Sequence, residues 1–301
     1  MREQVTRWLF APRPIVRLAL IRIAAPLAIV GFMSSRVIHA DDWLSAAGFR
    51  VPAIADWRQP LPLPAPPVWA AWTLALALVV AGVATALGAF TRWASAVFAV
   101  LLVYVALADR LAAFTVSKLA PMIALVLCLT PSGAAYSIDA WRRRRRDQPP
   151  PALVSGGCVS FFQILLPVFY FSSGLCKASH DWLSESHVLW THLHDSYQTW
   201  ISWQLANLLP PFAWTAIQAA VLAFEVGAPL WFGLPWTRRY AMGFGVVMHL
   251  MIGLMFGPVI WFSLLMIAVL VPSYAPERWL ARVLPAPPTD QRKLPGKIVA
   301  G

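Results

Sequence analysis

The sequence predicts an all-α integral membrane protein, a polytopic bundle of about eight transmembrane helices with both termini in the cytoplasm. Three observations support this fold class. Apolar residues make up 59% of the 301 positions and charged residues only 12%, about half the charge of an ordinary soluble domain. Several apolar runs reach roughly 20 residues, enough to cross a hydrocarbon core of about 30 Å. The basic residues fall in segments between those runs.

The domain organisation follows from these apolar runs. A short, basic and aromatic segment, residues 1–15, is expected to lie at the membrane interface. Residues 16–275 form the transmembrane domain, and residues 276–301 form a basic, proline-containing cytoplasmic tail. The eight predicted spans are 16–34, 67–90, 93–109, 117–134, 158–178, 212–234, 240–256 and 258–275.

Charge gives the orientation. With eight spans the connecting loops alternate between the two sides, and the strongly basic segments, such as Arg142–Arg146 and Arg238–Arg239, all fall on the side of the termini. Cytoplasmic loops are enriched in Lys and Arg, so the long loops 35–66 and 180–210 should cap the outer face. This topology suits a multi-pass protein of a bacterial inner membrane. It also accounts for the net charge of +11 without a nucleic-acid partner.

Metal and disulfide chemistry have weak support. Cys128, Cys158 and Cys176 are odd in number and form no CxxC pair, so we expect free, buried thiols. The loop 180–195 carries four histidines and three acids but no established ligand spacing. We expect a wet interfacial loop there, with a zinc or copper site as the open alternative.

The fifth span carries a polar face. Gln163, Tyr170, Ser173, Gly174 and Lys177 recur at spacings of 3, 4 and 7 residues, which places them on one side of a helix. Ionisable residues within a span are candidates for functional sites. Lys177 has two interpretations. It can extend to the interface as an ordinary helix-end lysine, or it can be desolvated and act as a neutral amine base.

Three more ionisable residues lie at predicted membrane depth. Glu225 and His249 fall near the middle of the sixth and seventh spans, and Arg22 lies in the first. A charge at mid-membrane costs about 2.5–3.5 kcal/mol on insertion scales. Burial should therefore favour a neutral Glu225 unless a cation such as Arg22 is close. The alternative is a structural role, in which these side chains join helices by hydrogen bonds.

Several short motifs occur in an order typical of one family. The pattern YFxxGxxKxxxDW at 170–182 resembles the membrane domain of vitamin K-dependent gamma-carboxylase, which is shared with the bacterial horizontally transferred transmembrane (HTTM) family. Similarity extends over residues 15–280. The other resembling segments are Arg22-Ile-Ala-Ala, Arg58-Gln-Pro-Leu-Pro-Leu, Tyr136-Ser-Ile-Asp139 with the following arginines, Glu225, and His249 with Trp261-Phe-Ser-Leu-Leu-Met266.

The resemblance implies a chemistry. In the carboxylase the lysine of this motif deprotonates vitamin K hydroquinone, oxygen converts it to the epoxide, and the strong base so formed removes a glutamate γ-proton. By position that role falls to Lys177, with a vitamin K-like quinol as cofactor. The implied site is an outward-facing cavity lined by Tyr170, Ser173, Gln163, Glu225, His249 and Arg22. The chain departs from the family in having Thr115-Val116 where the carboxylase has an Asn-His pair, and in lacking the large domain that follows.

Two further functions remain open. The protein can be a non-catalytic helper or scaffold that holds a peptide or partner protein through its two outer loops. It can also be a transporter, although no inverted repeat is evident. The predicted partners are membrane lipid, a lipid-soluble quinone and a peptide or protein at the outer face.

Overall fold

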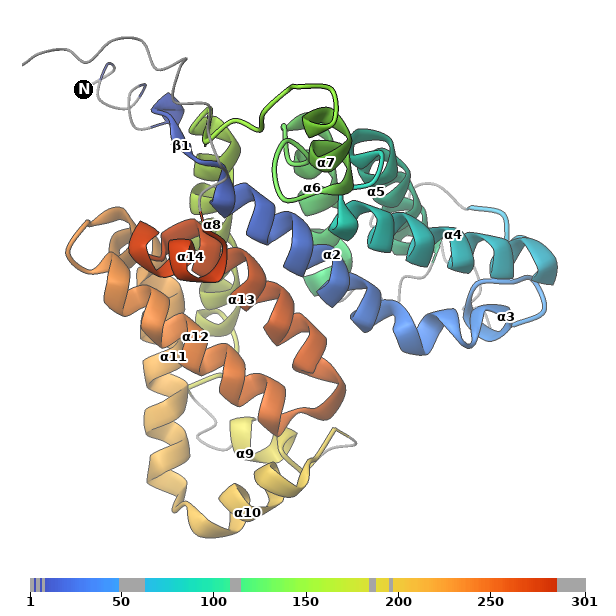
Figure 1. Ribbon diagram of the computed structural model, residues 1–301. Helices are drawn as coiled ribbons and strands as arrows, with labels where there is room; N and C mark the ends of the chain where they lie inside the picture. The colour runs from blue at the N-terminus through green and yellow to red at the C-terminus, as the bar shows by residue number, and fades with distance from the viewer. Residues whose placement is uncertain are drawn as a thin grey trace, which may run out of the picture.

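The computed structural model describes residues 3, 6, 9–48, 63–108, 115–183, 188–194 and 197–285. Within these ranges the chain is mainly helical, with very little strand (Figure 1). The described strands are β1 (Arg13–Pro14) and β2 (Leu153–Val154), which pair antiparallel. The all-α prediction is therefore confirmed. The described residues exclude 49–62, 286–301 and most of 1–8, together with the basic residues of those segments.

Eight longer helices occupy the eight predicted spans. They are α2 (Ile15–Val37), α4 (Val68–Leu87), α5 (Thr91–Ala108), α6 (Thr115–Leu129), α8 (Gly157–Ala178), α11 (Pro211–Gly233), α12 (Arg238–Met255) and α13 (Ile260–Tyr274). Within the described ranges, six segments are long and apolar enough to cross a membrane. The described helix α6 is a shorter apolar helix, and α12 begins with two arginines. The polytopic membrane bundle is thus confirmed.

Short helices connect the long ones. They are α3 (Ala40–Trp43), α7 (Ile138–Arg144), α9 (Val188–His192), α10 (Trp200–Leu208) and the 3₁₀ turn η1 (Gly257–Val259), and a further short helix, α14 (Glu277–Val283), follows α13. The predicted fourth span ran to residue 134, but α6 ends at Leu129. Pro131 explains the earlier end, because proline disfavours helical backbone at the residue before it and lacks an N–H group.

The long helices form two packed groups joined along α2 and α13. In the first group α2 packs on α4, α4 on α5, and α5 on α6; in the second, α8 packs on α11 and α12 on α13. Figure 1 shows α2 and α13 side by side between the groups. One cluster of buried apolar side chains runs through both, from Leu18 and Ile21 on α2 to Leu265 and Val269 on α13.

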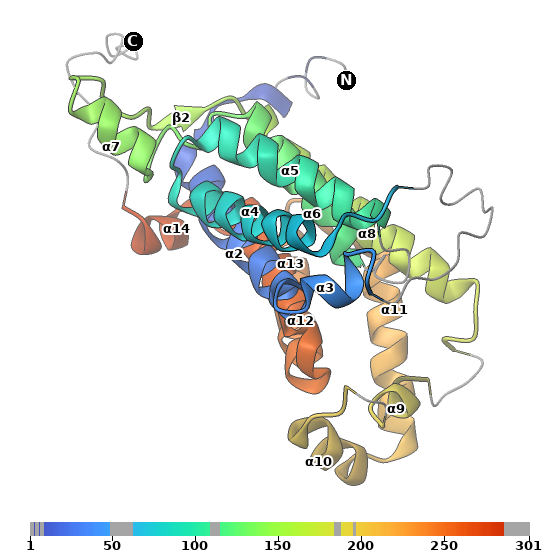
Figure 2. The ribbon, with the colours of Figure 1, turned by 90° about the vertical axis from the view of Figure 1, so that its right-hand side faces the viewer.

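Basic segments gather at one end of the bundle. Figure 2 shows α7, the strand β2 and α14 together there, with α3, α9 and α10 toward the other end. The Arg17 guanidinium donates to the carbonyls of Pro272 at 2.8 Å and Ala275 at 3.0 Å. Arg238 lies 6.0 Å from the Tyr274 ring just before α14. The arrangement is the one that the positive-inside assignment requires of the described loops.

Asp139 at the start of α7 fastens this basic end. Its carboxylate accepts hydrogen bonds from the backbone N–H groups of Phe90, at 2.9 Å, and Thr91, at 2.7 Å. Burial opposes ionisation of Asp139, but these bonds, the Thr91 hydroxyl and the Arg143 charge outweigh it, so its pKa lies below the usual range. Asp139 of α7 therefore caps the first turn of α5, where the backbone N–H groups have no acceptor within their own helix.

Candidate functional site

The polar face of α8 lies against α11. Gly174 makes the close approach possible, because a Cβ atom there would lie 2.7 Å from the Val226 backbone nitrogen and 2.9 Å from the Glu225 Cβ. No such contact is tolerable for a side chain on a rigid helix. The glycine therefore brings two helices together one turn before Lys177, which lies in the last turn of α8.

Lys177 and Glu225 form an ion pair between these helices. The Lys177 Nζ donates to Glu225 Oε2 at 2.5 Å and Oε1 at 2.7 Å, and to the Ser173 hydroxyl oxygen at 2.9 Å. The Glu225 side chain is 7% exposed and that of Lys177 is 24% exposed. Charge-assisted hydrogen bonds of this length are among the stronger ones in proteins. The carboxylate end is buried, while the amine keeps partial access to the surroundings.

The segment after α8 folds over the amine. The Trp182 ring centre lies 5.2 Å from Lys177 Nζ, within cation–π range. The Trp182 indole donates to the Gln218 carbonyl at 2.9 Å, and the Gln218 amide donates back to the Trp182 carbonyl at 2.5 Å. Gln218 also accepts from the Leu189 backbone N–H at 3.2 Å. Since Gln218 lies about two turns before Glu225 on α11, these bonds fix a cover beside the ion pair.

A second polar pair joins α8 to α12. The Tyr170 hydroxyl and His249 Nε2 lie 2.8 Å apart, and His249 is 1% exposed. Phe224 meets the Tyr170 ring edge to face, and Phe232 stacks on it. Either group can donate, depending on the imidazole tautomer. His249 Nδ1 is buried without a hydrogen-bond partner among the described residues, so the pair has an unused polar atom.

The other two predicted cavity residues lie elsewhere. Arg22 donates to the carbonyls of Thr85, Ala86 and Tyr136 near the end of α4, so it fastens the basic end of the bundle. The cation close to Glu225 is Lys177, and not Arg22, which the sequence analysis named as an example of such a cation. Gln163 lies further along α8, where its amide donates to the Ser273 carbonyl at 2.7 Å.

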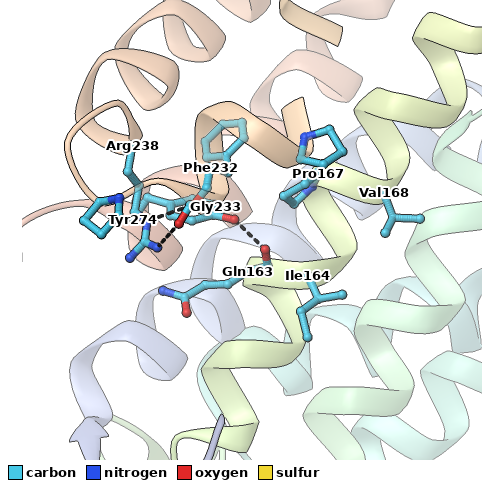
Figure 3. A pocket seen from close by; sticks show the side chains of 10 residues that line it. Gln163, Ile164, Pro167, Val168, Phe232, Gly233, Arg238 and Tyr274 are labelled. Atoms are coloured by element: carbon cyan, nitrogen blue, oxygen red, sulfur yellow. Dashed lines mark hydrogen bonds between the residues drawn. The ribbon is translucent and has the colours of Figure 1, made fainter. Parts of the chain in front are cut away.

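A cavity of about 480 Å³ lies between α8, α11 and α13 (Figure 3). Of the six residues predicted to line an outward cavity with Lys177, it includes Gln163 alone. Its position beside Arg238 and Tyr274 is at the basic end, opposite the end where Lys177 lies. The lining residues are Gln163, Ile164, Pro167, Val168, Pro229, Phe232, Gly233, Pro235, Arg238 and Tyr274.

The described residues contain no group of three side chains suited to a metal ion. His180, His192 and His194 are exposed, and each places Nδ1 about 2.7–2.8 Å from the carbonyl four residues earlier. His187, Glu185 and Asp195 lie outside the described residues. The three cysteines are free, with Cys128 and Cys158 half-buried and Cys176 exposed, whereas we expected all three to be buried.

Reasoning from the sequence missed Gln218 and the cover that it holds. The available signal was a single amide in an apolar run, about two turns before Glu225 on the same predicted span; in the structure Gln218 is fully buried. Val116, which stands where the resembling carboxylase has a histidine, is 1% exposed and packs in the apolar core.

Comparison with known proteins assigns the chain to a family. The family model of the HTTM domain matches residues 10–279, which includes all eight long helices and both polar pairs. A search of the curated proteins and a search of the solved structures gave no match. The matched region covers far more than half of the chain, and the protein therefore belongs to the HTTM domain family.

Proposed function

We propose that this HTTM-domain protein is a membrane enzyme whose Lys177–Glu225 pair exchanges a proton with a lipid-soluble quinol. The observation that carries the proposal is the pair itself, an amine held 2.5 Å from a carboxylate that is 7% exposed. Ionisable groups within a membrane-spanning bundle are costly to place and are typical of functional sites in membranes. The proposed location is a bacterial inner membrane, with the Lys177 end facing away from the cytoplasm.

The pair can supply a base without adding net charge to the site. Transfer of one proton from Lys177 to Glu225 converts ammonium and carboxylate into amine and carboxylic acid, the form that desolvation favours. The neutral amine then takes the hydroxyl proton of the quinol. This step leaves an ammonium beside the quinol anion, so the new charges are paired. Trp182 and the Gln218 hydrogen bonds limit the access of water to the amine.

Oxygen completes the proposed reaction. The quinol anion reduces O2, one oxygen atom enters the ring as the epoxide and the other leaves as hydroxide, which takes up the proton held by Lys177. The sum is quinol plus O2 giving quinone epoxide plus water. Val116 offers no proton-transfer group where the resembling carboxylase has a histidine, so we do not extend the proposal to glutamate carboxylation.

The test is quinol turnover in a bilayer. The purified protein is reconstituted in nanodiscs with a naphthohydroquinone and O2, and the quinone epoxide is measured by chromatography. Lys177→Met and Glu225→Gln should each lower the rate by at least about a hundredfold, as expected for loss of a general base. Lys118→Met, which changes an exposed lysine on α6, should retain the rate. Absence of epoxide from the folded wild-type protein would refute the proposed reaction.

A second candidate is a non-catalytic scaffold for a peptide or protein. It is supported by the outer end of the molecule, where Trp200 and Trp203 of α10 are 73% and 50% exposed, and by the complete pairing of Lys177. Trp200→Ala with Trp203→Ala would then abolish the cellular function, whereas Lys177→Met would leave it intact. The enzyme proposal requires the reverse result.

A further inference from the structure

The cavity at the basic end has features of a binding site that is separate from the Lys177–Glu225 pair. Two helix prolines line it, Pro167 of α8 and Pro229 of α11. Proline removes a helix hydrogen bond and bends the helix locally. The Tyr274 hydroxyl compensates in α8, because it donates at 2.5 Å to the Gln163 carbonyl that Pro167 leaves without its usual donor. The hydrogen bond from Tyr274 therefore braces α8 beside the cavity, which is partly open to the surface and has a volume of about 480 Å³, within the range of ligand sites.

Gln163 lines this cavity and has an unused hydrogen-bond acceptor. The side chain is 9% exposed, and its Nε2 donates to the Ser273 carbonyl at 2.7 Å, which sets the orientation of the amide. Its Oε1 is buried and has no hydrogen-bond partner among the described residues. A buried acceptor without a partner is destabilising. A ligand that brings a hydroxyl donor would remove this destabilisation.

Arg238 supplies a fixed positive charge at the same end of the cavity. Its Nε donates to the Phe232 carbonyl at 3.0 Å and its Nη2 to the Gly233 carbonyl at 3.3 Å. No carboxylate among the described residues pairs with it. In Figure 3 Gln163 lies on the side of Arg238 and Tyr274, whereas Ile164, Pro167 and Val168 line the other side. The cavity thus has a cationic, hydrogen-bonding end and an apolar wall.

We propose that this cavity binds an anionic phospholipid whose headgroup carries a hydroxyl, such as phosphatidylglycerol. The phosphate would pair with Arg238, a headgroup hydroxyl would donate to Gln163 Oε1, and the start of an acyl chain would lie along Ile164, Pro167 and Pro229. The charge of Arg238 selects this occupant over a neutral quinol, because the cation has no carboxylate partner in the described protein. Basic pockets between helices at the cytoplasmic side are suited to such headgroups.

Lipid retention, measured by native mass spectrometry, tests whether the Arg238 charge holds the lipid phosphate. The protein is equilibrated with phosphatidylglycerol or phosphatidylcholine and then released from detergent. Arg238→Gln should lower retention of phosphatidylglycerol about fivefold, which corresponds to about 1 kcal/mol. Arg239→Gln is the matched control and should change little, because the Arg239 guanidinium stacks on Tyr240 and lies outside the cavity lining. Equal losses in the two variants, or equal retention of phosphatidylcholine by the wild type, would overturn the proposal.

A lipid without the headgroup hydroxyl tests the contact with Gln163, and a variant that fills the cavity tests whether the lipid occupies it. Phosphatidylmethanol has the same charge as phosphatidylglycerol but no headgroup hydroxyl, so the wild type should retain it several-fold less, and Gln163→Leu should remove that difference. Gly233→Leu should block binding, because a Cβ at Gly233 meets no atom within 4 Å and would extend into the cavity. Gly243→Leu, at a glycine with equally open surroundings, should not. Displacement of the lipid by a neutral quinol at equal concentration would also overturn the proposal of an anionic phospholipid.

Discussion

Removal of either partner of the Lys177–Glu225 pair should destabilise the fold by unequal amounts. Breaking a buried ion pair by removing one partner costs about 3–5 kcal/mol, whereas an exposed pair contributes about 0–1 kcal/mol. This pair lies between those limits, because Glu225 is 7% exposed but Lys177 is 24% exposed. The order of the losses follows from which group is left buried.

Lys177→Met leaves a carboxylate among apolar side chains of α8 and α11. We expect a loss of about 2–3 kcal/mol in the free energy of unfolding, between the values for exposed and for buried pairs. Glu225→Gln leaves an ammonium that keeps Ser173 and can turn toward water, so about 1–2 kcal/mol is expected. The double variant Lys177→Met with Glu225→Gln leaves no unpaired charge and should be more stable than Lys177→Met alone.

The assay is reversible unfolding in bicelles, analysed as a double-mutant cycle. Lys118→Met on α6 is the matched control and should change the stability by less than about 0.5 kcal/mol, as for an ordinary surface substitution. The reasoning fails if Lys177→Met costs no more than Lys118→Met. It fails equally if the two single losses simply add in the double variant, because the groups would then not be coupled.

Three other changes have defined outcomes. Asp139→Asn should cost about 1 kcal/mol at neutral pH. Because the folded pKa of Asp139 is lowered, its contribution is complete above the unfolded value of about 4 and is lost as the pH falls below it, so melting curves from pH 7 to pH 3 should converge for wild type and variant. Gly174→Leu should separate α8 from α11 at a cost of about 1–3 kcal/mol, whereas Gly243→Leu should be nearly neutral; unchanged melting of Gly174→Leu would contradict the close packing. Gln218→Leu frees Trp182, so Lys177 should react faster with a water-soluble amine reagent, as followed by peptide mass spectrometry; an unchanged rate would show that Trp182 does not cover the amine.

Most of the helices could be predicted from the sequence because apolar length and charge are local properties. The shared face of Tyr170, Ser173, Gly174 and Lys177 was also predictable, since the helical period fixes positions within one helix. The pairing of Glu225 with Lys177 could not be predicted. Arg22 and Lys177 were both basic residues in predicted spans, and the choice between them depends on which helices pack together and at what relative depth. Spacing along the chain contains no direct information about that register.

The cavity at the basic end could not be predicted, for a similar reason. Pro167 and Pro229 are visible in the sequence as helix breakers, but their approach to one another results from the packing of α8 on α11. The cover over Lys177 depends on Gln218, whose two amide atoms are both used in pairing with a distant loop. Such side-chain pairings between separate segments become evident only when the helices are placed together.

The two packed groups of helices contribute unequally to the polar pairs. Both polar pairs come from α8, α11 and α12, all after the arginine-rich segment, whereas α2, α4, α5 and α6 before it support them from one flank. Beyond the β1–β2 pair, the halves meet mainly along α2 and α13. Two coexpressed fragments separated between Asp147 and Pro151 would retain complementary surfaces for reassembly.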